Sequence, residues 1–245
     1  MKHATLFLLL LGTLLACDPK YPAEQPTAPE IPAVSPPSTS PSPPATTTTT
    51  TSSSSPEEPV LQSADFNNDG AHDFLEIRMR DREDSGLGKE RDLVVYSGAG
   101  DTRKDWYTAK SVLLSTENGG MMGDPLEDVN IDGNTIVIKH FGGSRQKWAY
   151  THRFRWQNGD FQLIGVTVHA GAPCDYFEAL DYNLSTGNAD WVKTTQDCSE
   201  GEEGPVITEV THSFNEKPVV RASMNGFRTG EYELKIPKMD ESVYF

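Results

Sequence analysis

The sequence predicts an all-β domain, an antiparallel sandwich or rolled sheet, over residues 60–245. β-branched and aromatic residues gather in short runs of alternating polarity, a period typical of half-buried strands. Asp132-Gly133 and Asn158-Gly159 stand between such runs, where a tight hairpin needs positive φ. Amphipathic helical periodicity is scarce. The stretch is long enough for a single domain with a core of its own.

The first strands are expected at FLEIRM (74–79) and DLVVYSG (92–98), with the charged segment RDREDSGLGKER (80–91) as the loop between them. The run AKSVLLS (109–115) suits either a strand or a helix, because short apolar runs carry no decisive period. The domain therefore begins with a strand pair and an undecided third element.

Two hairpins are expected next, each with its turn at one of the two glycine dipeptides. For the second hairpin, a turn at Asn158-Gly159 fixes which residues face each other across the two strands. The expected pairs are Trp156 with Phe161, Phe154 with Leu163, and Trp148 with His169.

The strand before Asn158 divides its side chains between two faces. An aromatic face suited to the core carries Trp148, Tyr150, His152, Phe154 and Trp156. The cationic stripe on the other face consists of Arg145, Lys147, Arg153 and Arg155. A solvated face is the favoured interpretation of this stripe; the alternative is contact with the protein's own carboxylates or with an anionic glycan.

Further along, a hairpin is expected around Ser185-Thr186-Gly187, with late strands within 204–214 and 231–238. Cys174 and Cys198 are expected to form a disulfide, since an exported domain with two thiols usually joins them. Such a bond would be worth about 3 kcal/mol. Two free thiols remain the alternative.

The chain begins with the layout of a lipoprotein signal peptide, residues 1–16. A lysine precedes an apolar run too short to span a bilayer, and Leu14-Leu15-Ala16-Cys17 resembles the bacterial lipobox, in which the cysteine is lipidated. Cys17 is thus the expected lipidation site, and several acyl chains there would anchor the protein firmly. An ordinary cleaved signal is the alternative.

Residues 17–59 are expected to be a disordered tether rich in Pro, Thr and Ser, because they hold too few apolar side chains to offset ordering entropy. The expected location is the bacterial cell envelope, with the domain facing the periplasm or the exterior. The choice between inner and outer membrane stays open.

A formal net charge of −15 argues against nucleic acid and against anionic membrane surfaces as partners of the domain. Membrane contact is therefore expected only through the lipid anchor. The same charge favours binding of divalent cations.

The segment DFNNDGAHDFLE (65–76) predicts a calcium loop, because oxygen-bearing side chains recur at alternate positions around a glycine. The spacing satisfies the EF-hand pattern, yet no helix flanks it. A strand leaving the loop better resembles the DxDxDGxxD loops of FG-GAP and related extracellular β-proteins. A metal-free polar turn and another divalent ion are the alternatives. The expected ligands are Asp65, Asn67, Asp69, Ala71 through its carbonyl and Asp73, with Glu76 as a weaker sixth.

A near copy, DVNIDGNTI (128–136), keeps the spacing but has Ile136 where the first loop has an acid. Alternating Val129 and Ile131 favour a hairpin there, not a metal site.

Three segments are similar to segments of exported bacterial lipoproteins that also place an NDG calcium-type loop ahead of them. They are GGMMGDPLEDVNIDGNTIVIKHFGGS (119–144), KWAYTHRFRWQNGDFQLIG (147–165) and DYNLSTG (181–187). The resemblance covers about Asp65 to Gly187. It implies a fold family and an exported location, and it implies no reaction.

No catalytic motif stands out. The histidines lack ligand spacing, no GxSxG is present, and acid pairs such as Glu178 and Asp181 arise by chance in an acidic chain. The glycine-flanked pair Met121-Met122 is expected to plug the core, with an exposed contact surface as the alternative. The leading interpretation is a binding protein for a protein or glycan partner. The alternative is a hydrolase of envelope polysaccharide or peptidoglycan that uses paired carboxylates.

Overall fold

The computed structural model describes residues 62–84, 86–199, 204–218 and 221–245. All of these residues belong to one compact unit, Ser55–Phe245. The expected signal peptide, Cys17 and the tether lie outside the described residues. The unit Ser55–Phe245 contains every described strand and a buried core from Phe66 to Phe245, so it has what it needs to fold on its own.

The first sheet has three antiparallel strands in the order β1-β2-β3. They are β1 (Asp73–Asp84), β2 (Gly88–Ser97) and β3 (Lys104–Lys110), with a short 3-10 turn, η1 (Gly100–Thr102), before β3. The loop expected at 80–91 is wrong, because both strands continue into it. Arg80 forms ion pairs with Glu90 and Asp92 across the two strands, so the charged residues stabilise the ladder instead of ending it.

The undecided run at 109–115 is neither a helix nor a full strand. β3 ends at Lys110, and Ser111 takes a left-handed φ of 69° that turns the chain. Val112 and Leu113 then lie in the core.

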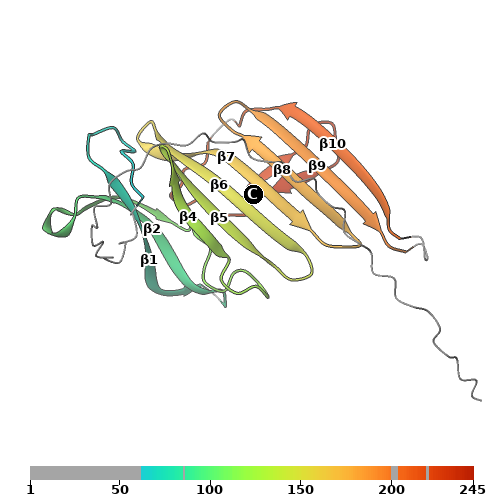
Figure 1. The fold of residues 1–245 in the computed structure, drawn as a ribbon, viewed down its shortest axis with the longest axis horizontal. Coiled ribbons are helices and arrows are strands. Elements are labelled where there is room, and N and C mark those ends of the chain that lie inside the picture. The colour runs from blue at the N-terminus through green and yellow to red at the C-terminus, as the bar shows by residue number, and fades with distance from the viewer. Residues whose placement is uncertain (1–61, 85, 200–203, 219–220) are drawn as a thin grey trace, which may run out of the picture. The chain divides into compact units, whose positions relative to one another are not determined.

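The second sheet has seven antiparallel strands in the order β10-β9-β8-β7-β6-β5-β4, so each strand pairs with its neighbours in sequence (Figure 1). This arrangement confirms the predicted antiparallel all-β class, and the turn around Ser185 joins two strands as expected. The strands are β4 (Leu126–Asp132), β5 (Thr135–Gly143), β6 (Lys147–Gln157), β7 (Asp160–Gly171), β8 (Tyr176–Asn183), β9 (Asn188–Asp197) and β10 (Val206–Asn215).

The predicted register of the β6–β7 hairpin holds near the turn and fails farther away. Trp156 pairs with Phe161, and Phe154 pairs with Leu163, as expected. A bulge beside Phe154 then shifts the register, so Trp148 lies opposite Ala170 and not His169.

The turn of the β4–β5 hairpin also differs from the expectation by one residue. Asp132 pairs with Thr135, which leaves Gly133 and Asn134 as the turn residues.

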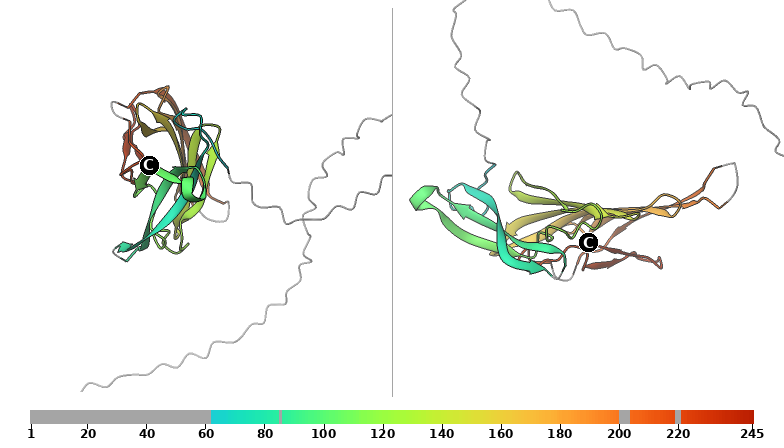
Figure 2. Two further views of the ribbon diagram at one scale, coloured as in Figure 1. Left: turned by 90° about the vertical axis from the view of Figure 1, so that its left-hand side faces the viewer. Right: turned by 90° about the horizontal axis from the view of Figure 1, so that it is seen from below.

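One face of the seven-stranded sheet is covered, and the aromatic side of β6 belongs to it, as predicted. His152 and Phe154 are buried there, and Phe227 packs edge-on against Phe154 at 5.4 Å between centroids. The C-terminal segment lies on this side of the sheet (Figure 2) and includes the hairpin of β11 (Glu233–Lys235) and β12 (Ser242–Tyr244). It contributes Met224, Phe227, Ile236, Val243 and Phe245 to the core.

The opposite face of the seven-stranded sheet, called the open face below, carries exposed polar residues such as Arg155, His169 and Asp181. The predicted polar side of β6 therefore lies on this face.

Candidate functional site

The loop from Asp65 to Asp73 is closed at its base by backbone hydrogen bonds. The Asp73 amide donates to the Ala64 carbonyl at 2.7 Å, and the Ala64 amide donates to the Asp73 carbonyl at 3.2 Å. Within the loop, Asn68 and Gly70 take positive φ values of 58° and 87°. This closure holds the loop directly at the start of β1.

Three polar side chains of the loop turn back on its own backbone. The Asp65 carboxylate accepts hydrogen bonds from the amides of Asp69 at 3.0 Å and Gly70 at 2.9 Å. The Asn67 side-chain oxygen also accepts from the Asp69 amide, at 3.0 Å. The Ala71 amide donates to the Asp69 carboxylate at 2.9 Å and lowers the pKa of that carboxyl. These bonds gather the side chains that the sequence predicted, and they are also the bonds of a polar turn.

Asp73 differs from the other acids because its side chain is buried. It accepts hydrogen bonds from the Phe66 amide at 3.0 Å and from the indole N–H of Trp106 at 2.8 Å. Burial raises the pKa of Asp73 despite these donors. Trp106 in turn packs against Trp156, with ring centroids 5.1 Å apart. One carboxylate thus connects the loop to β3 and to the aromatic core.

Glu76 lies on β1, and its carboxylate is paired with two arginine side chains. Its carboxylate pairs with Arg103 and with Arg78, the latter at 2.8 Å, and the hydrogen bond from Arg103 is the main reason that the pKa of Glu76 is lowered. The structure therefore brings Asp65, Asn67, Asp69, Ala71 and Asp73 together in one loop and gives Glu76 other partners.

The donors of the loop suit calcium by their chemistry, since all are hard oxygens on a short flexible segment. Within the described ranges, no group of three or more His, Cys, Asp or Glu side chains is arranged to hold a metal ion. A bound cation would therefore draw on Asn67 and the Ala71 carbonyl as well as on the acids. Sequence reasoning missed Trp106, whose indole N–H holds Asp73.

The near copy at 128–136 is a hairpin, as predicted. Its Asp128 accepts a hydrogen bond from the Asn130 side chain at 2.7 Å and lies 3.5 Å from the Lys139 ammonium. Ile136 is fully buried in the core.

The predicted disulfide between Cys174 and Cys198 is present, with the two Cα atoms 5.2 Å apart. It joins the β7–β8 loop to the end of β9. A disulfide of this kind indicates an oxidising, extracytoplasmic location.

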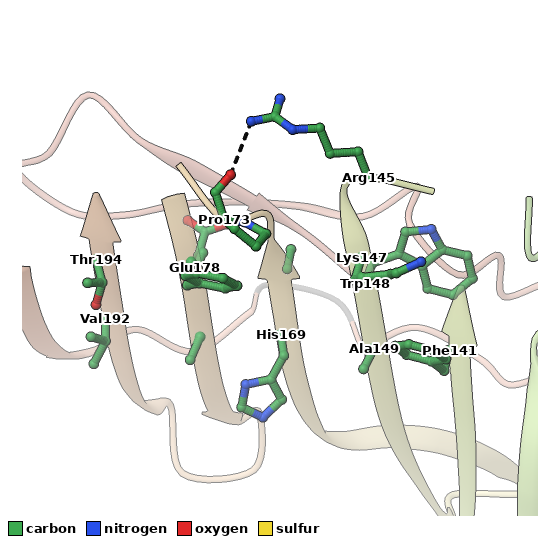
Figure 3. Close-up of a pocket in the computed structure, with 14 residues that line it drawn as sticks. Phe141, Arg145, Lys147, Trp148, Ala149, His169, Pro173, Glu178, Val192 and Thr194 are labelled. Carbon is green, nitrogen blue, oxygen red and sulfur yellow. Dashed lines mark hydrogen bonds between the residues drawn. The ribbon is translucent and has the colours of Figure 1, made fainter. Parts of the chain in front are cut away.

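An open groove of about 540 Å³ lies over the open face, across β5 to β9 (Figure 3). Its lining is mostly apolar, with Arg145, Lys147, His169, Glu178 and Thr194 as polar members. The volume falls within the range of about 300–1,000 Å³ that is usual for ligand pockets. Sequence reasoning did not predict this groove, although its two cations were part of the cationic stripe.

Two of the histidines have structural surroundings, as the missing ligand spacing suggested. Burial lowers the pKa of His140 to about 4 and that of His152 to about 3, so both are neutral in the folded protein near pH 7. Both neutral rings contribute packing to the core, and His140 also accepts a hydrogen bond from the Leu114 amide at 3.3 Å.

The methionine pair is not a core plug. Met121 is 85% exposed and Met122 is 46% exposed, because the glycines around them let the loop turn outward. The expectation that they fill the core is wrong, since both side chains are exposed.

Comparison of the chain with protein-family models, curated proteins and solved structures finds no match. In the part of the chain that the structure describes, no helix has the length and apolar character needed to cross a membrane.

Proposed function

We propose that the protein is a lipid-anchored, extracytoplasmic binding domain whose Asp65–Asp73 loop holds a structural calcium ion. The buried carboxylate of Asp73 carries the calcium part of this proposal. It accepts hydrogen bonds from the loop amide of Phe66 and the indole of Trp106, while burial, and to a lesser extent the negative charges of Asp69 and Asp65, raise its pKa. A cation in the loop would offset this repulsion, and it would stabilise the folded state because the unfolded chain lacks the site.

The anchor and the tether support the envelope location. Cys17 follows a lipobox-like sequence, and the Pro-, Thr- and Ser-rich residues after it suit a spacer between a membrane and a domain. The lipid anchor thus makes the contact with the membrane, while the domain is free to bind a protein, a glycan or a smaller ligand.

Thermal unfolding of residues 55–245 tests the calcium loop. Melting temperatures are measured in calcium, in magnesium and in chelator, for the wild type, Asp69→Ala and the matched control Asp132→Ala. We expect a calcium-specific rise in the wild type and in Asp132→Ala, and no rise in Asp69→Ala. Equal melting temperatures in all three solutions, from a demonstrably metal-free sample, would reduce the loop to a polar turn.

The alternative of a hydrolase depends on one specific pair of acids. Glu178 and Asp181 do not form such a pair, because the first binds the Trp191 indole and the second lies on the opposite face of β8. Asp181 and Asp190 are direct cross-strand neighbours on the open face, which favours this alternative as a second candidate. Digestion of purified peptidoglycan by the wild type, abolished in Asp190→Asn, would support it; no digestion by the wild type would dismiss it.

A further inference from the structure

The groove on the open face exists because small residues occupy its centre. Across the sheet, Phe141 pairs with Ala149, Ala149 with His169, His169 with Ala179, and Ala179 with Val192. Two alanines in this row leave a low floor between larger side chains. The five strands that it crosses span about 19 Å at the usual strand spacing.

The next row of cross-strand neighbours, toward the ends of the strands, also has a small residue at its centre. Gly171 lies between Lys147 and Phe177, and a Cβ atom at Gly171 would meet the Tyr176 carbonyl oxygen at 2.2 Å. Phe177 is 42% exposed, so an aromatic ring borders the groove without a cover of its own. The groove is thus a hollow with an apolar floor and an apolar wall.

Two cations stand at the β6 side of the groove, within a strongly acidic protein. Arg145 donates one hydrogen bond, to the Pro173 carbonyl at 3.1 Å (Figure 3), and Lys147 contacts the Met122 sulfur at 3.3 Å. Neither forms an ion pair with any acid among the residues that the structure describes. Most of the guanidinium N–H groups and the ammonium group therefore remain available to an anion.

The nearby acids define a direction along the groove. Glu209 lies at the β10 side, where it contacts Thr194 at 3.4 Å between oxygens. Asp175 is near the loop of Arg145 but accepts a hydrogen bond from Gln146 at 2.7 Å. Glu178 lines the groove from β8, but its carboxylate accepts a hydrogen bond from the Trp191 indole at 2.8 Å on the other face of the sheet. An anion is therefore attracted at the Arg145 and Lys147 end and repelled at the far end, while the floor between them is apolar.

We propose that this groove binds a single-chain anionic amphiphile: an acyl or alkyl chain along the floor, with a carboxylate or phosphate head at Arg145 and Lys147. The chain covers Ala149, Ala179 and Val192, and the head receives charge-assisted hydrogen bonds. Met122, flexible and half-exposed beside Lys147, adapts to the part of the ligand near the head. This inference names the ligand class for the binding role proposed above.

Calorimetric titration of residues 55–245 with monomeric dodecanoate, dodecyl phosphate and dodecanol tests the proposal. We expect saturable one-to-one binding of the two anions and binding weaker by about tenfold for the neutral alcohol. The double variant Arg145→Ala/Lys147→Ala weakens binding of dodecanoate by about tenfold or more. Ala179→Phe, which fills the floor at a solvent-facing position, abolishes it.

Arg155→Ala is the matched control, since it removes an exposed arginine from the same face of β6 outside the groove. An equal loss in this control would mean general charge attraction and would overturn the proposal. Absence of dodecanoate binding, or binding only to anionic phospholipid vesicles, would overturn it too. The same titration on Asp69→Ala separates the two proposals: amphiphile binding there, without a calcium response, leaves the groove in place and removes the calcium role of the loop.

Discussion

The two segments with the sequence pattern DxNxDG have similar sequences but different structures. In the first, Asp65, Asn67 and Asp69 bond to the loop's own amides around Gly70. In the second, the equivalent residues lie in and beside two paired strands, and Gly133 belongs to a two-residue turn. The intervening residues decide the outcome, since Val129 and Ile131 are both apolar, as a half-buried strand requires, whereas the equivalent positions hold Phe66 and the polar Asn68.

The ninth position of each pattern shows the difference most clearly. Asp73 and Ile136 are both fully buried. The first is held by an amide and an indole, while the second packs among hydrophobic side chains. The same spacing of residues therefore ends in a polar or an apolar environment, according to the partners that the fold supplies at the ninth position.

The largest loss of stability is expected from Ile136→Asp, which completes the acidic pattern in the hairpin. Because the new carboxylate has no polar partner in the core, we expect the free energy of unfolding to fall by more than about 4 kcal/mol. Urea unfolding measures the change. A stable variant that gains a calcium response would contradict the distinction between the two loops.

The next largest effect is expected from Asp73→Ala. This change removes the acceptor of two donors, the buried Phe66 amide and the half-buried Trp106 indole, and should cost about 3 kcal/mol even in chelator. Equilibrium unfolding, together with a change in tryptophan fluorescence, checks it. Unchanged stability would show that the acid does not hold the loop to β3.

A smaller loss of stability is expected from replacing either of the two turn glycines, and it should be the same at both positions. Gly70 and Gly133 have φ values of 87° and 56°, and a Cβ atom at either meets nothing within 4 Å. Gly70→Ala and Gly133→Ala should therefore each cost about 1 kcal/mol through backbone strain alone. A much larger loss at Gly70 in calcium than in chelator would add a metal-dependent role for that turn.

The smallest effect is expected from Glu76→Gln. Its carboxylate is partly exposed and already pairs with Arg78 and Arg103, so the loss in stability should stay below about 0.5 kcal/mol. The calcium-dependent rise in melting temperature should be unchanged. A lost calcium response would restore Glu76 as a sixth ligand.

The parts of the fold that depend on local sequence could be predicted. Asn158-Gly159 fixed the nearby register, alternation identified the buried face of β6, and the cysteines paired as expected. The bulge beside Phe154 could not be predicted, because it follows from packing along a long strand pair and not from a turn signal. For the same reason, the expected partner of Trp148 was displaced by one residue.

The groove illustrates what a single sequence hides. Ala149, Gly171 and Ala179 lie on three different strands, and none of them is unusual by itself. Only the register places them side by side. In the loop from Asp65 to Asp73, the polar side chains are contiguous in the sequence, whereas Trp106 reaches Asp73 from a distant strand.

The order of strands in the large sheet has a consequence for the time course of folding. From β5 to β10, every strand pairs with the strand that precedes it, so the sheet has few long loops to close and can grow in sequence order. Its covered face, however, needs Phe227, Ile236 and Phe245. During passage across a membrane, the sheet would therefore emerge with an unfinished hydrophobic side, and lasting stability would wait for the final segment to arrive.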